Sequence, residues 1–259
     1  MALVTFLSDF GEEDHYVAAV KAALIQQLSG QVQIVDISHR IEAHDISHAS
    51  YVLSNAYSHF PEGTIHLAGI EPHDHSDSDT LIAVLDGHYF VGGDTGLFTL
   101  LKKDQLPIVY KVNRPYHTFA ALVNYVPVTV ELAKGKKPET IGRLDEQYLR
   151  LFARQPKVTR REIVGNVIRV DHYGNLITNI PKNDFDTIRK INGEKSFKIQ
   201  IGLQVFEKLH DKYDDVENGE CYILFNEAGK LQFGINKGHG AKLLGLKFDS
   251  PVYIHFETE

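Results

Sequence analysis

Acidic side chains gather in one short turn near the start of the chain. They are Asp9, Glu12, Glu13 and Asp14. The turn lies between residues 3–7, an apolar run typical of a buried strand, and residues 16–24, whose apolar side chains recur at helical spacing. In open α/β sheets, ligands bind beyond the carboxyl ends of the strands, where this turn falls. Carboxylates in that position suit ribose hydroxyls, an ammonium group or another cation. In the structural alternative, an aspartate caps the helix and the acids stabilise its first turn.

A second group of reactive side chains lies in residues 71–79, EPHDHSDSD, directly after the apolar run 64–70. Its nitrogen and oxygen donors are Glu71, His73, Asp74, His75, Asp77 and Asp79. A zinc ion held by three of them would activate water directly. Consecutive donors of this kind are more often a solvated polar loop. We therefore assign no metal ligands and keep a metal-dependent hydrolase as an alternative function.

The composition argues against several classes of protein. The 259 residues are 43% hydrophobic and 24% charged, as in ordinary globular proteins. A net charge of −7 without a block of Lys and Arg argues against nucleic-acid binding. No apolar run approaches the roughly 20 residues that span a bilayer, and the N-terminus lacks a basic signal region. The single cysteine, Cys221, excludes an intrachain disulfide. We expect a cytoplasmic protein without a nucleic-acid or membrane partner.

The order of the predicted elements indicates an α/β fold in the first part of the chain. Residues 3–7, 32–37 and 64–70 are predicted strands, and they alternate with predicted helices at 16–24 and 46–59. This alternation favours a mixed, largely parallel sheet with helices on both faces.

The pattern changes after a basic segment at about residues 151–161, which is predicted to be a linker. Short β runs separated by turn residues follow it. These runs are 166–170, 176–180, 197–201, 222–225, 231–235 and 252–256. We therefore expect an α/β domain in residues 1–150 and a small all-β barrel or sandwich in residues 162–259.

Six motifs occur along the chain in a fixed order. They are SDFG-x-x-D-x-Y-V (8–17), DISH (36–39), FPEGTIH (60–66), YFVGGDTGL (89–97), VDHYGNLITNI (170–180) and GKLQFGINKGHGAKLLGL (229–246). Together they resemble the S-adenosylmethionine hydroxide adenosyltransferases, relatives of the fluorinase and chlorinase. The resemblance implies an α/β N-terminal domain, a C-terminal β-barrel and a homotrimer with its sites at subunit interfaces.

The resemblance also implies which residues contact an adenosyl ligand. Asp14 matches an acid that holds the ribose diol, and Asp171 and Asn175 match residues at the methionine and adenine ends. Tyr173 takes the place of an aromatic near adenine, and Glu227 replaces a serine at the methionine end. The complete set of expected contacts is Asp9, Asp14, His44, Thr118, Phe119, Asp171, Tyr173, Asn175, Asn226 and Glu227.

The chain departs from the resemblance at the residues that handle water. Hydrolytic relatives carry an Asp, an Arg and a His there, and this chain has Glu71, Ser78 and Ala120 in those positions. Glu71 is expected to orient or deprotonate water, with His73 or His75 in place of the missing histidine. A halide would be repelled by Glu71.

The predicted function is binding of S-adenosylmethionine and its hydrolysis to adenosine and methionine by attack of water at the ribose 5′ carbon. S-adenosylmethionine would then be a substrate or ligand, and no separate cofactor is expected. A non-catalytic protein that binds S-adenosylmethionine or adenosine is the first alternative, and the metal-dependent hydrolase is the second.

Overall fold

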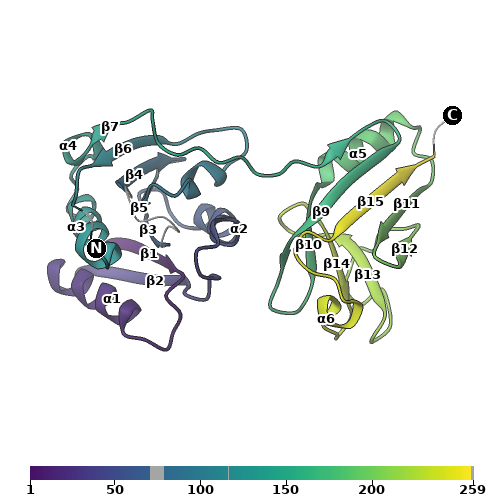
Figure 1. Ribbon diagram of the computed structural model, residues 1–259, viewed down its shortest axis with the longest axis horizontal. Helices are drawn as coiled ribbons and strands as arrows, with labels where there is room; N and C mark the ends of the chain where they lie inside the picture. Colours follow the sequence, from purple (N-terminus) through teal and green to yellow (C-terminus); the bar gives the residue numbers. More distant parts are fainter. Residues whose placement is uncertain (71–78, 116, 258–259) are drawn as a thin grey trace. The chain divides into compact units, whose positions relative to one another are not determined.

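The computed structural model describes residues 1–70, 79–115 and 117–257 (Figure 1). These residues form two compact units, Met1–Ala153 and Arg154–Glu259. Within the described residues, no helix is long and apolar enough to cross a bilayer.

The first unit is built on a mixed sheet with the strand order β2-β1-β3-β5-β4-β6-β7. Its strands are β1 (Ala2–Ser8), β2 (Val32–Ser38), β3 (Ile65–Gly69), β4 (Thr80–Leu85), β5 (His88–Gly93), β6 (Ile108–Val112) and β7 (Arg143–Leu144). Strands β2, β1, β3 and β5 run parallel, whereas β4, β6 and β7 pair antiparallel. The expected largely parallel arrangement therefore holds for the half of the sheet that contains β1.

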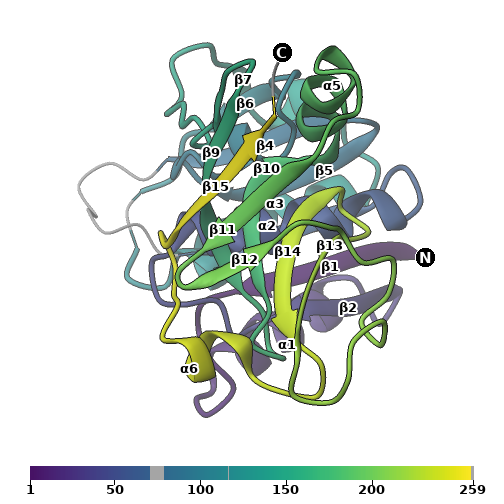
Figure 2. The same ribbon diagram turned by 90° about the vertical axis from the view of Figure 1, so that its right-hand side faces the viewer.

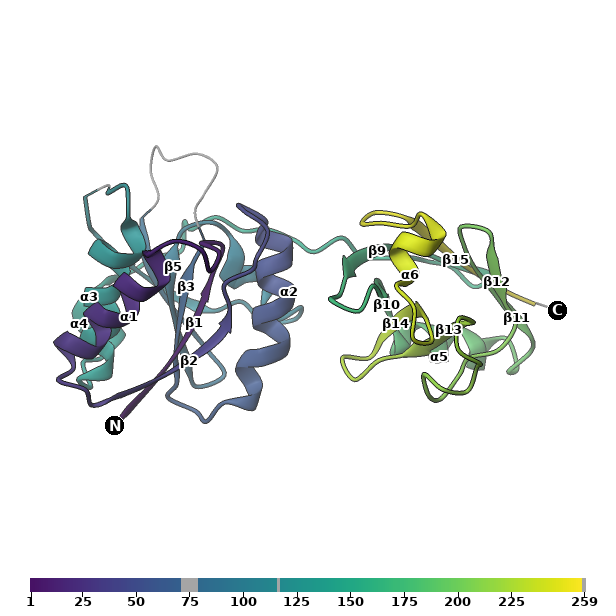
Figure 3. The same ribbon diagram turned by 90° about the horizontal axis from the view of Figure 1, so that it is seen from below.

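Helices cover both faces of this sheet (Figure 3). The helices and helical turns are α1 (Tyr16–Gln27), α2 (Ile46–Ala56), η1 (Tyr57–His59), η2 (Leu97–Leu100), the π-helical turn η3 (Ala121–Tyr125), α3 (Val126–Ala133) and α4 (Pro138–Ile141). Successive side chains of a strand point to opposite faces. Val4 and Phe6 of β1 accordingly pack with α1 and α3, and Leu7 packs with α2.

The second unit is an antiparallel sheet with the order β12-β11-β15-β9-β10-β14-β13, and a short strand, β8, pairs with β9 (Figure 2). Its strands are β8 (Lys157–Val158), β9 (Glu162–Val170), β10 (Leu176–Pro181), β11 (Phe197–Ile201), β12 (Gln204–Phe206), β13 (Cys221–Phe225), β14 (Lys230–Ile235) and β15 (Pro251–Phe256). The predicted linker thus contributes β8 to this sheet.

The antiparallel sheet wraps around one apolar core and forms a nearly closed barrel. Strands from both ends of the path contribute to that core, including Ile199 of β11 and Ile223 of β13. Two helices, α5 (Lys182–Ile191) and α6 (Gly240–Leu244), accompany the strands. Phe185 of α5 is buried in the same core. The expected all-β domain is therefore a barrel with two added helices.

Candidate functional site

The loops that follow β1 and β2 lie side by side at the carboxyl edge of the sheet. We call residues 9–15 and 39–45 the β1/β2 rim. Asp9 accepts a hydrogen bond from the backbone N–H of His44, with Oδ2 and N 2.9 Å apart. His44 has a positive φ of 63°. The structure thus brings together two of the residues expected to contact a ligand.

Two further contacts connect the halves of the rim. The backbone N–H of Gly11 donates to the carbonyl of His39 at 2.9 Å. The guanidinium of Arg40 donates to the carboxylate of Glu12 at 2.6 Å. Asp14 lies in the same rim with an exposed side chain. An acid at this place is accessible to a hydroxyl or a cation.

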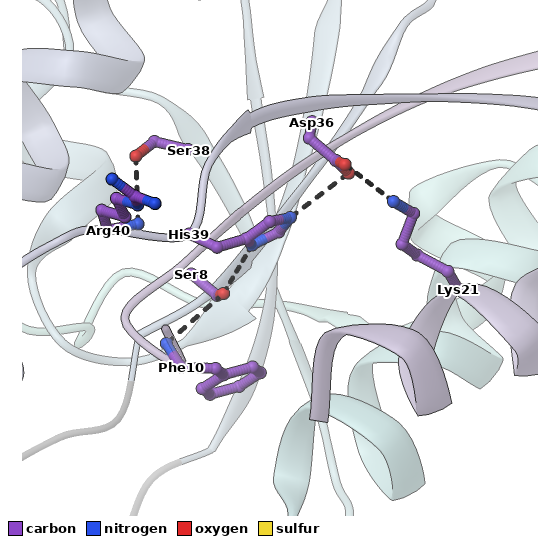
Figure 4. A network of polar contacts seen from close by, with 7 residues as sticks. All are labelled: Ser8, Phe10, Lys21, Asp36, Ser38, His39 and Arg40. Atoms are coloured by element: carbon purple, nitrogen blue, oxygen red, sulfur yellow. Dashed lines mark hydrogen bonds and ion pairs between the residues drawn. The ribbon is translucent and has the colours of Figure 1, made fainter. Parts of the chain in front are cut away.

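A series of polar contacts connects the rim to β1, β2 and α1 (Figure 4). The hydroxyl of Ser8 lies 2.7 Å from Nδ1 of His39, and Nε2 of His39 lies 3.2 Å from the carboxylate of Asp36. Lys21 pairs with the other oxygen of Asp36 at 2.7 Å. Burial raises the pKa of Asp36, but the contacts with Lys21 and His39 outweigh burial and leave that pKa below its ordinary value. Ser8 is completely buried, so this series of polar contacts holds the rim in place and does not offer a nucleophile.

Aromatic rings from separate segments meet beside the rim. Phe10 lies 5.8 Å from Phe119 and 6.0 Å from Tyr16, measured between ring centroids. Phe119 belongs to the segment expected to contact the ligand, and its neighbour Thr118 is exposed. Ala120, which stands where the resemblance expects a histidine, is buried in the core on the α1 side of the sheet.

The expected catalytic residues, Glu71, His73 and His75, lie outside the described residues. Ser8 of β1 pairs in register with Gly69 of β3. Ile70, which follows Gly69, is the last described residue before the segment 71–78. The chain therefore enters the segment 71–78 from a strand that borders β1.

Asp79, the last donor of the acidic and histidine-rich run, forms an ion pair with Lys111. Within the described residues, no group of three His, Cys, Asp or Glu side chains could hold a metal ion. Asp94 lies near Asp79, since its backbone N–H donates to the carbonyl of Asp79. Burial raises the pKa of the Asp94 carboxyl.

In the second unit, the turn between β9 and β10 holds a compact pair of side chains. Both oxygens of Asp171 accept hydrogen bonds from Asn175, one from its backbone N–H and one from its side-chain amide, each at 2.8 Å. The hydroxyl of Tyr222 donates to the amide oxygen of Asn175 at 2.6 Å.

The contacts continue to a third expected residue, Asn226. The amide of Gln232 donates to the Tyr222 hydroxyl at 3.5 Å, and its oxygen accepts from Asn226 at 3.2 Å. We call Asp171, Asn175, Tyr222, Gln232 and Asn226 the Asp171 network. It unites three predicted ligand residues with two residues that were not predicted to contact a ligand, Tyr222 and Gln232, although Gln232 lies within the motif at 229–246.

The remaining expected contacts of this unit are more exposed. Tyr173 is 75% exposed and stands beside His172, with ring centroids 5.6 Å apart. Glu227 is exposed on the turn after β13. Gly174 has a φ of +86°, and a Cβ at that position would overlap the imidazole of His239. The turn that carries Tyr173 is therefore fitted closely to the start of α6.

Comparison with known proteins yields consistent similarities over nearly the whole chain. Residues 4–142 match the family model of the SAM hydroxide adenosyltransferase N-terminal domain, and residues 165–253 match that of its C-terminal domain. The chain is 30% identical to an (R)-S-adenosyl-L-methionine hydrolase of Thermus thermophilus, over 98% of this chain and 100% of that protein. A fluorinase of Nocardia brasiliensis is 25% identical over 97% and 96% of the two chains. A crystal structure of an uncharacterized conserved protein from Thermotoga maritima superposes with a TM-score of 0.85 at 26% identity, covering 97% and 99%.

Proposed function

Because the chain belongs to the SAM hydroxide adenosyltransferase family, we propose that it hydrolyses S-adenosylmethionine to adenosine and methionine. The observation that carries the proposal is the match of both domains of the family, in order, to residues 4–142 and 165–253. A relative that is 30% identical over essentially its full length bears the name of a hydrolase of this substrate.

The proposed reaction is a displacement at the ribose 5′ carbon. The oxygen of water attacks that carbon as the bond from carbon to sulfur breaks, and the electron pair of that bond stays on sulfur. The sulfonium becomes a neutral thioether, so the leaving group needs no proton. The water must lie in line behind the carbon and must lose a proton. We propose that Glu71 accepts that proton, with His73 or His75 as its partner.

The ligand contacts of the proposal come from both units. In the first unit, the exposed carboxylate of Asp14 suits the ribose hydroxyls, and Asp9 holds the loop that carries His44. In the second unit, the Asp171 network presents a carboxylate for the substrate ammonium and an amide for the base. The homotrimer implied by the resemblance is part of this proposal, and light scattering of the purified protein would test it.

We propose further that the preferred substrate is the epimer with the (R) configuration at sulfur. Support comes from the name (R)-S-adenosyl-L-methionine hydrolase, which is shared by relatives in Thermus thermophilus and Methanocaldococcus jannaschii, the latter 29% identical over 97% of this chain.

Binding without turnover is the second candidate function. Ala120 favours it, because a buried methyl group with 6% exposure stands where hydrolytic relatives carry a histidine. A side chain without a polar atom cannot orient water.

The test is incubation of the purified protein with each epimer, followed by chromatography of adenosine, methionine and remaining substrate. The matched variants are Glu71→Gln and Glu146→Gln, the latter an exposed acid of the first unit. We expect Glu71→Gln to lower kcat by about 100-fold or more and Glu146→Gln to leave it unchanged.

Each outcome of this experiment selects one function. Equimolar adenosine and methionine support hydrolysis, and loss of activity in a chelator favours the metal-dependent alternative. Retained substrate without products indicates a binding protein. A protein that neither binds nor converts either epimer overturns the adenosyl assignment.

A further inference from the structure

The hydrogen bonds of the Asp171 network all point in one direction. A carboxylate only accepts hydrogen bonds, so the side chain of Asn175 must turn its nitrogen toward Asp171. Its oxygen consequently faces Tyr222, whose hydroxyl donates to it at 2.6 Å. The orientation of an amide that could otherwise flip is thus set by a charged neighbour on one side and a donor on the other.

The same direction continues through the more distant members. With its proton committed to Asn175, the oxygen of Tyr222 accepts from the nitrogen of Gln232. The oxygen of Gln232 in turn accepts from the nitrogen of Asn226. The Asp171 carboxylate at one end and the backbone N–H of Lys230, which donates to the Asn226 side-chain oxygen at 3.0 Å, at the other end therefore fix the orientation of the four side chains between them. Hydrogen bonds linked head to tail also strengthen one another.

Two features favour the hydrogen bond from Tyr222 to Asn175. Burial raises the pKa of Tyr222 to about 12, so its hydroxyl keeps its proton at any physiological pH. Gly234 lies opposite Tyr222 in the pairing of β13 with β14. A Cβ at Gly234 would collide with the Tyr222 oxygen and would lie only 2.5 Å from the oxygen of Asn175. The close approach of these two oxygens thus requires glycine at this position.

We propose that Tyr222 and Gln232 are positioning residues that hold the Asn175 amide ready for the base of an adenosyl ligand. The network uses one N–H and one oxygen lone pair of that amide and leaves one of each. An asparagine amide that offers a donor and an acceptor together is complementary to the edge of adenine that carries the 6-amino group. The inference rests on the proposed function, because it takes Asn175 to be a ligand contact.

Tyr222 and Gln232 act through Asn175 rather than on the ligand. Their exposed fractions are 3% and 4%, against 9% for Asn175, so Asn175 is the most open of the three side chains to a bound molecule. Neither residue is assigned to the reacting atoms. Their loss should therefore weaken recognition of the base and raise KM while kcat changes little.

The experiment compares Tyr222→Phe with Tyr213→Phe. Tyr213 packs against Tyr222 with ring centroids 5.2 Å apart, but its hydroxyl carries none of the hydrogen bonds of the network. Calorimetry measures the Kd of adenosine and of purine riboside, which lacks the 6-amino group. We expect Tyr222→Phe to weaken adenosine about 10-fold, as for loss of one well-placed hydrogen bond, and to change purine riboside little. Tyr213→Phe should match the wild type for both ligands.

A second variant separates hydrogen bonding from packing. Gln232→Glu keeps the shape of the side chain, but a carboxylate would accept the Tyr222 proton and draw it away from Asn175. The variant should lose the preference for adenosine while the ring of Tyr222 stays in place. Thermal unfolding of each variant confirms that the barrel is folded.

The outcomes distinguish this inference from the proposed function. If the wild type prefers adenosine and both variants keep that preference, Tyr222 and Gln232 have no positioning role and the proposed function stands. If the wild type binds neither adenosine nor S-adenosylmethionine, the proposed function fails and this inference fails with it. Loss of the preference in Tyr222→Phe and Gln232→Glu, but not in Tyr213→Phe, supports the inference.

Discussion

The β1/β2 rim and the Asp171 network hold their candidate ligand residues by different means. In the rim, the carboxylate of Asp9 contacts the backbone of His44, and the charged pair Arg40 and Glu12 is largely exposed. In the network, side chains contact other side chains, and Asn175 and Tyr222 are almost fully buried. In both regions a carboxylate accepts a hydrogen bond from a backbone N–H, but only the second region removes the partner residues from water.

The difference has an energetic consequence. An exposed ion pair contributes about 0–1 kcal/mol, because water and salt compete for both partners. A buried group that loses its partner costs about 1–3 kcal/mol, because it then has no hydrogen bond at all. Changes in the second unit should therefore disturb both stability and recognition, whereas changes in the rim should disturb mainly the loop that they touch.

The largest effect is expected from Gly174→Ala in the turn of the Asp171 network. The new Cβ would collide with the ring of His239, and the positive φ adds backbone strain. We expect a loss of about 2–4 kcal/mol in the free energy of unfolding, measured with urea.

Gly219→Ala is the matched control for this prediction. Gly219 has a φ of +87°, nearly the same as Gly174, but no atom lies within 4 Å of the place that a Cβ would take there. Only the strain of about 1–2 kcal/mol should remain. Equal losses in the two variants would show that His239 moves aside and that the turn is not closely fitted to α6.

The helices and strands of the two units were also unequally predictable from the sequence. Apolar runs located β1 and β2, and apolar side chains at helical spacing located α1 and α2, because both are local patterns in the sequence. The predicted helix at 46–59 corresponds to α2 continued by η1. β8 was missed, because a strand of two residues has no periodicity and depends on its pairing with β9.

The same distinction applies to the candidate sites. Asp171 and Asn175 are four residues apart, and their motif is visible in the sequence. Tyr222 and Gln232 join them only through the pairing of β13 with β14, which sets Tyr222 opposite Gly234. A tyrosine and a glutamine within apolar strands were the available signal, but register across strands is not a local property.

An effect of intermediate size is expected from acid, which should lower the free energy of unfolding through a buried histidine of the first unit. His66 of the first unit is fully buried between the hydroxyl of Thr5 and the ring of His88, at 2.7 and 3.1 Å. Burial lowers the pKa of His66 to about 3 and also lowers that of His88. Below the ordinary pKa of 6.5, the unfolded chain gains a proton that folded His66 does not accept. The free energy of unfolding should therefore fall by about 2 kcal/mol between pH 7 and pH 5.

Urea unfolding at both pH values measures this loss in the wild type, in His66→Asn and in His59→Gln. His66→Asn should remove most of the pH dependence, because the histidine with the larger lowering of its pKa is gone, and His88 should account for the rest. His59 is exposed, so its replacement should leave the dependence as in the wild type. A pH dependence in His66→Asn as large as in the wild type would show that groups other than His66 cause it.

The smallest effect is expected within the rim, from Asp9→Ala. The backbone N–H of His44 loses its charged acceptor, and the left-handed conformation of His44 loses one of its restraints. Because the site is only partly buried, water replaces part of the contact, and we expect a cost of about 1 kcal/mol in urea unfolding. Glu12→Ala removes the exposed ion pair with Arg40 and should cost less than about 0.5 kcal/mol. If Glu12→Ala costs as much as Asp9→Ala, the exposed ion pair holds the rim as strongly as the contact between Asp9 and His44, and exposure does not explain the difference between the two regions.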